Sequence, residues 1–116
     1  MAAYQELEIE QGTDWDDELL LVDANGDPVD LTGYTARCDF KRRIEDAAAL
    51  ISLTTGNGRI VITPLTGSVL RSLTSAETAN IEFRNALHDL ILISASGIVV
   101  RICSGPVTVS PQITVQ

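Results

Sequence analysis

His88 is the only histidine of the 116-residue chain, and Asp89 follows it directly. Nucleophilic catalysis requires a base beside the nucleophile and a further group that orients the base. Residues 87–94 are typical of a strand, in which neighbouring side chains point to opposite faces. Asp89 is therefore badly placed to orient the His88 ring, and we expect a strand histidine with a local partner rather than a catalytic base.

The segment from residue 23 to residue 34 begins like a calcium-binding loop and then departs from one. Its alternating oxygen-bearing side chains are Asp23, Asn25 and Asp27. The sixth position is Pro28, where such a loop has glycine, and the twelfth is Tyr34, where it has a bidentate glutamate. A second acidic group comprises Asp14, Asp16 and Asp17. The chain has no histidine cluster and no closely spaced cysteine pair. We interpret this region as a solvated acidic loop, and we expect no metal and no cofactor.

Charge is strongly segregated along the chain. Sixteen acidic and eight basic residues give a net charge of -8, and the first 36 residues contain ten acidic side chains and no basic one. Nucleic-acid binding requires a Lys/Arg cluster that displaces counterions, and the only basic run, at residues 41–43, is interpreted as a solvated strand end. We expect no nucleic-acid partner. The acidic third favours solubility or docking to a basic surface of another protein.

The two cysteines, Cys38 and Cys103, lie among apolar residues in predicted strands. We expect two buried thiols that behave as small hydrophobic side chains, with a bridge between sheets as the alternative. No apolar stretch approaches the roughly 20 residues that cross a bilayer, and the acidic N-terminus lacks the apolar run of a signal peptide. We expect no membrane association and no small-molecule substrate.

Residues 19–40 contain the strongest local pattern of the chain. An Asn25-Gly26 pair, which favours a tight hairpin turn, lies between two predicted strands. A polar corner around Leu31 follows, with Leu31 expected in the core. In the second strand, alternate residues share one face, as expected for a half-buried strand: Tyr34, Ala36, Cys38 and Phe40.

Similar short patterns recur about every ten residues. We expect strands over residues 4–10, 15–22, 34–44, 50–53, 59–63, 69–73, 87–94 and 98–103, with 107–109 and 113–115 forming the last one or two. The last part is expected at an edge or bend, after a break at residues 105–106. Thr74 and Glu77 predict a capped helical turn near 74–80, and Trp15 is predicted to anchor the core. This pattern predicts one domain over 1–116: an all-β, two-sheet antiparallel sandwich of about eight or nine strands.

A series of motifs, in this order, resembles small β-sandwich proteins of tailed bacteriophages. The motifs are Gly12-x-x-Trp15, the segment 23–37 (DANGDPVDLTGYTAR), Gly58-x-Ile60-x-Ile62, the turn at 75–79, Asp89-Leu90 and the segment 99–114. The chain is similar to the N-terminal domain of phage baseplate upper proteins and to the virion-attached ends of tail fibres. The resemblance implies an immunoglobulin-like sandwich, without catalytic residues, that docks other virion proteins, commonly as a trimer or ring. No coiled coil or receptor-binding domain follows in this sequence, which favours an adaptor or small structural subunit.

We therefore expect a non-enzymatic structural protein of the virion, assembled in the cytoplasm of the bacterial host, at the tail, baseplate or tail-fibre attachment. Its partners would be other phage virion proteins and copies of itself, as a trimer or hexameric ring. The alternatives are a capsid decoration or head-to-tail joining protein, and a carbohydrate-binding or small hydrolytic sandwich. The expected contact residues are Glu6, Glu8, Glu10, Asp14, Trp15, Asp16, Asp17, Asp23, Asn25, Asp27, Val107, Val109, Ile113 and Val115. The last four would form an exposed strand edge open to strand addition.

Overall fold

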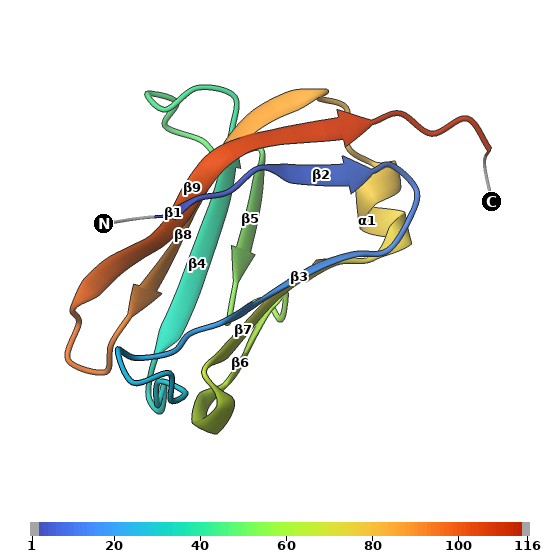
Figure 1. Ribbon diagram of the computed structural model, residues 1–116. Coiled ribbons are helices and arrows are strands. Elements are labelled where there is room, and N and C mark those ends of the chain that lie inside the picture. Colours follow the sequence, from blue (N-terminus) through green and yellow to red (C-terminus); the bar gives the residue numbers. More distant parts are fainter. Residues whose placement is uncertain (1–2, 115–116) are drawn as a thin grey trace.

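The computed structural model describes residues 3–114, which form two β-sheets packed face to face (Figure 1). The larger sheet contains β1 (Ala3–Tyr4), β2 (Leu7–Glu10), β4 (Thr35–Lys41), β5 (Ile51–Thr54), β8 (Asn85–Ile93) and β9 (Val99–Ser110). The smaller sheet contains β3 (Trp15–Leu20), β6 (Ile60–Thr63) and β7 (Ser68–Leu73). The helical segments are η1 (Pro64–Thr66) and α1 (Ser75–Ala79). The prediction of an all-β, two-sheet sandwich with one short helical turn is confirmed.

The strand order is that of an immunoglobulin-like sandwich. The larger sheet runs β1-β9-β8-β4-β5, with β2 also paired to β9, and the smaller sheet runs β3-β7-β6. In an immunoglobulin-like sandwich with strands A to G, strands B, E and D are neighbours in one sheet. Strands β3, β7 and β6 have these positions here. No helix among residues 3–114 is long and apolar enough to cross a membrane.

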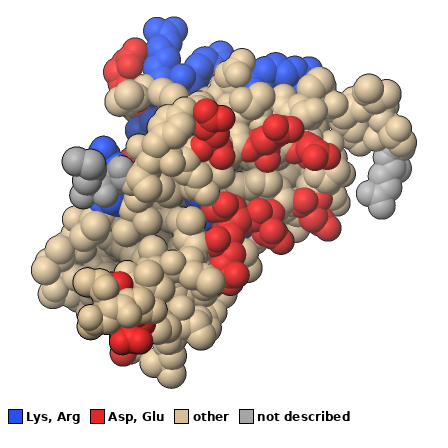
Figure 2. All heavy atoms as spheres, viewed as in Figure 1, with Lys and Arg blue, Asp and Glu red and all other residues tan. Residues whose placement is uncertain are grey.

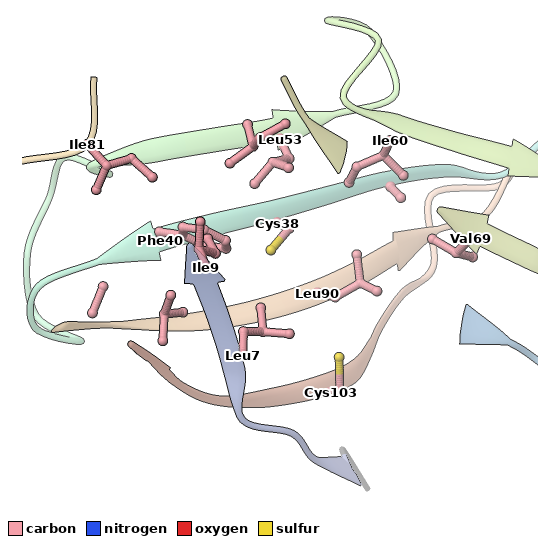
Figure 3. Packing of buried hydrophobic residues seen from close by; sticks show 14 of the residues in the cluster. Leu7, Ile9, Cys38, Phe40, Leu53, Ile60, Val69, Ile81, Leu90 and Cys103 are labelled. Atoms are coloured by element: carbon pink, nitrogen blue, oxygen red, sulfur yellow. The ribbon is translucent and has the colours of Figure 1, made fainter. Parts of the chain in front are cut away.

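Alternation of side chains along the strands builds the core between the sheets. In β4, Ala36, Cys38 and Phe40 are buried while Thr35 and Arg37 are exposed, as the sequence pattern predicted. Figure 3 shows side chains from both sheets and from the segment after α1 meeting in one cluster. Leu31, at the predicted corner, is also buried.

The first two strands pair with β9 in parallel, whereas the other strand pairs are antiparallel. In the register of β2, Leu7 lies opposite Val107. The predicted break at residues 105–106 is wrong, because β9 continues through Gly105 and Pro106 to Ser110. Gly105 allows this packing: a Cβ atom there would lie 2.1 Å from the carbonyl oxygen of Gln5.

The predicted hairpin within residues 19–40 is also wrong, although its turn exists. An isolated bridge joins Val22 to Pro28, and the Asp23 carboxylate accepts backbone hydrogen bonds from Asn25 (2.9 Å) and Asp27 (3.0 Å). The flanking strands do not pair, because β3 belongs to the smaller sheet and β4 to the larger one. The turn residues therefore shape a crossover between the sheets.

The helical turn forms by the predicted mechanism. The Thr74 hydroxyl accepts a hydrogen bond from the Glu77 amide (3.2 Å), and the Glu77 carboxylate accepts one from the Thr74 amide (2.9 Å). This reciprocal capping box satisfies two amides that a helix start leaves free. The helix carries the chain from β7 in the smaller sheet to β8 in the larger sheet.

Candidate docking surfaces and the buried polar network

A buried arginine on β7 joins the two sheets through a polar network. The Arg71 side chain is fully buried, and its Nη2 lies 2.6 Å from Asp17 Oδ2 and 2.8 Å from Gln5 Oε1. Its Nη1 lies 3.2 Å from His88 Nδ1 and 3.5 Å from Cys38 Sγ. In the alternation of β7, Arg71 shares a strand face with Val69 and Leu73, and this pattern is the sequence signal for its burial. It did not identify the partners, because they come from four separate segments.

His88 has local partners, as expected. Its Nε2 lies 2.9 Å from the Gln5 carbonyl oxygen, so Nε2–H donates there and Nδ1 accepts from Arg71. Burial lowers the pKa of His88, and the nearby Arg71 charge lowers it further. Asp89 lies outside this network and pairs with Arg101 instead. The ring is therefore neutral and fully engaged, which makes it a structural element of the network.

Both cysteines are free and buried, as the first of the two sequence interpretations predicted. Burial raises the pKa of Cys38 to about 11, and burial raises that of Cys103 as well. Cys103 Sγ donates to Gln5 Oε1 at 3.2 Å. Since the thiolate is the reactive form, both thiols are poor nucleophiles in the folded protein.

Acidic side chains gather along one lateral edge of the sandwich, over β2 and β3 (Figure 2). Each of these strands has a hydrogen-bonded neighbour on one side only: β9 for β2, and β7 for β3. Charged side chains on such an open edge discourage pairing with a strand of another molecule. The exposed acidic residues of this edge are Glu6, Glu8, Glu10, Asp14, Asp16 and Glu18.

Three predicted contact residues of this region have internal roles. Asp17 forms the ion pair with the buried Arg71. Trp15 is half-buried and packs edge-on against Phe40, with 6.2 Å between ring centroids, so it is a core anchor as predicted. Asp14 is exposed, and its carboxylate accepts a hydrogen bond from the Ser75 amide at 2.7 Å. These contacts hold β3 and α1 in place.

Residues 107–109 were predicted to belong to an exposed strand edge, and this prediction is wrong. Val107 and Val109 are buried, and β9 is paired with β8 on one side and with β1 and β2 on the other. Strand addition there would require removing β2. Ile113 is almost fully exposed and lies beyond the last strand, and Val115 lies outside the described residues.

The loop that carries Asp23, Asn25 and Asp27 is exposed. Its Asp23 carboxylate is turned toward backbone amides of the loop. Within residues 3–114, no group of three or more His, Cys, Asp or Glu side chains is arranged to hold a metal ion.

Large apolar side chains are exposed at one end of the sandwich. The end of β3 with its following loop, η1 and the β8–β9 hairpin all lie at this end (Figure 1, bottom). They carry Leu20, Val22, Leu65 and Ile98, which are 58% to 76% exposed. We call these four residues the apolar end. No local sequence pattern indicates that these three segments meet at one end.

Comparisons with known proteins leave the family open. No protein-family model and no curated protein matches the sequence. Among solved structures, one similar chain contains extracellular domains 3–5 of Drosophila OTK, with 12% sequence identity and a TM-score of 0.39. The match covers 90% of this chain and 32% of that one, so this chain spans about a third of its length.

Proposed function

We propose that this protein is a structural component of a tailed-bacteriophage virion, which docks to other virion proteins at the tail, baseplate or fibre attachment and catalyses no reaction. The ordered motif series supports the phage assignment, since it follows small virion β-sandwich proteins along nearly the whole chain. The apolar end is the structural observation that supports docking.

The physical argument for docking is the cost of the exposed apolar surface. Burying a Leu, Ile or Val side chain that was exposed contributes roughly 1.5–3 kcal/mol. Leu20, Val22, Leu65 and Ile98 come from three different segments that reach the same end. Large exposed apolar side chains that gather at one end of a molecule favour a protein interaction site.

The buried network supports a role without catalysis. His88, the only histidine, uses both ring nitrogens in contacts inside the protein. Both thiols are buried and have raised pKa values. Trp15 is packed against Phe40, so it does not offer the exposed aromatic platform that a carbohydrate-binding module needs.

The test is quantitative mass spectrometry of purified particles of the phage that carries the gene. We expect the chain in the particle at a handful to dozens of copies; hundreds of copies would instead indicate capsid decoration. Production in infected cells with no chain in purified particles would overturn the proposal.

Paired variants test the docking surface. Leu65→Asp with Ile98→Asp should abolish incorporation into particles while the purified variant stays folded. The matched control is Thr108→Asp with Ser110→Asp, which adds the same charge at exposed positions of β9. Incorporation of the Leu65/Ile98 variant at the wild-type level would refute docking through the apolar end.

A further inference from the structure

The outer face of the larger sheet is unusually apolar for a surface that faces water. An antiparallel sheet with one open face normally alternates apolar and polar residues. β8 breaks this rule, because its outward positions include Leu87, Ile91 and Ile93. Both faces of this strand carry apolar residues in the sequence, and the structure covers only one of them.

The register of β4, β8 and β9 arranges this face into four rows that run across the strands. From one end to the other, the rows are Thr35–Ile93–Val99, Arg37–Ile91–Arg101, Asp39–Asp89–Ser104 and Lys41–Leu87–Pro106. A bulge after Leu90 keeps the outward positions of β9 aligned with those of β8. The second row is cationic, the third is anionic, and the outer two are largely apolar.

The charged rows are partly satisfied within one chain by two ion pairs and by a hydrogen bond from Ser52 Oγ to Asp39 (2.9 Å). Asp39 and Asp89 lie directly opposite each other, and like charges in that position destabilise a sheet. Each has an arginine nearby: Arg37 Nε is 3.2 Å from Asp39, and Arg101 Nε is 3.6 Å from Asp89. Both arginine side chains are at least half exposed, so these pairs contribute little and can take additional partners.

We infer that this face is a twofold interface that binds a second copy of the same chain. The twofold axis lies in the plane of contact, runs parallel to the rows and passes between the two charged rows. It places the first row of one copy opposite the fourth row of the other, and the second row opposite the third. The cationic row of one copy then lies over the anionic row of the other, and apolar rows lie over apolar rows. A closed pair of this kind is isologous, the commonest form of self-association.

Charge favours this face over the other surfaces of the chain. It carries three cations (Arg37, Lys41 and Arg101) and two carboxylates, in a chain with twice as many acidic as basic residues. Two copies approaching through the acidic edge would repel each other. The face also contains a groove of about 640 Å³, beside which Tyr4 and Ile44 stand 72% and 81% exposed.

This inference goes beyond the proposed function and does not depend on it. It concerns the oligomeric state of the purified protein, which can be measured without a particle. A dimer, or a hexamer with twofold axes, contains such a pair, whereas a trimer with only threefold symmetry does not.

Charge-reversal variants test the interface by light scattering coupled to size exclusion and by sedimentation equilibrium. We expect twice the chain mass for the wild type. R37D/R101D makes both charged rows anionic, and D39R/D89R makes both cationic, so each alone should dissociate, with a rise in Kd on the order of 100-fold. Mixing the two variants restores opposite charges in both contacts and should give a heterodimer, which native mass spectrometry identifies.

A matched control applies the same charge change elsewhere. D16R/D27R makes the same charge change as D39R/D89R at exposed residues of β3 in the smaller sheet and of its following loop, and it should remain a dimer. If a reversal variant unfolds, Val99→Asp replaces it, because Val99 is 57% exposed in the first row and lies outside the core. A monomeric wild type, a dimer that survives the reversals, or a mixture that stays monomeric would overturn the inference.

Discussion

Replacing the buried arginine should be among the most costly single changes in this protein. Arg71→Met keeps much of the side-chain volume but removes the charge that faces Asp17 at 2.6 Å. The Asp17 side chain is only 20% exposed, so its carboxylate is left largely desolvated, without a counter-charge and with the Gln5 side-chain amide as a remaining donor (3.0 Å). Removing one partner of a buried ion pair costs about 3–5 kcal/mol. For a chain of this size, that corresponds to a fall in Tm of roughly 10–20 °C.

Urea unfolding followed by circular dichroism, with thermal melts in parallel, measures the effect. Arg59→Met is the matched control, because Arg59 pairs with Glu77 at a much more exposed site, and its loss should cost about 1 kcal/mol or less. The double variant Arg71→Met/Asp17→Leu also removes the Asp17 carboxylate, which has lost its counter-charge, and should recover most of the lost stability. An Arg71→Met variant that costs less than about 1 kcal/mol, or a double variant as unstable as the single, would refute this reasoning.

Three further changes follow from the same packing. Burial lowers the pKa of His88, so the unfolded chain binds a proton at this residue at a higher pH than the folded chain does. The free energy of unfolding should therefore decrease as the pH falls below about 6.5. The variant His88→Gln should remove this pH dependence above about pH 5. Burial raises the pKa of Cys38 to about 11, so a thiol reagent at pH 8 should modify the native protein slowly and the unfolded protein at once; fast native labelling would contradict this. Gly105→Ala places a Cβ atom 2.1 Å from the Gln5 carbonyl oxygen and should lower Tm and speed hydrogen exchange at the Gln5 amide, whereas Gly56→Ala, with its nearest contact at 3.7 Å, should change neither.

The sequence predicted most of the layer architecture, because it depends on local signals. The alternation of Ala36, Cys38 and Phe40 and the capping pair Thr74 and Glu77 each act within a few residues. Such signals do not say which strands become neighbours. The Asn25-Gly26 turn is real, yet the strands on either side of it lie in different sheets.

The candidate surfaces were harder to predict because they depend on distant pairings. Val107 and Val109 were expected at an exposed edge, but the parallel pairing with β2 buries them. A local sequence pattern does not indicate a partner strand that lies a hundred residues away. The four rows of the outer face depend on the register of three strands and on one bulge. The sequence showed only that β8 is apolar on both faces.

The parallel pairing of β2 with β9 also determines how the protein responds to mechanical load. The chain enters β2 at Leu7 and leaves β9 at Ser110, and these two points lie at opposite ends of the paired segment. Tension applied to the two ends of the chain would slide the strands along each other, so every hydrogen bond of the register carries load simultaneously. In an antiparallel hairpin pulled from its open end, the bonds break one after another. The shear arrangement therefore gives this fold a high resistance to extension along the line that joins its ends.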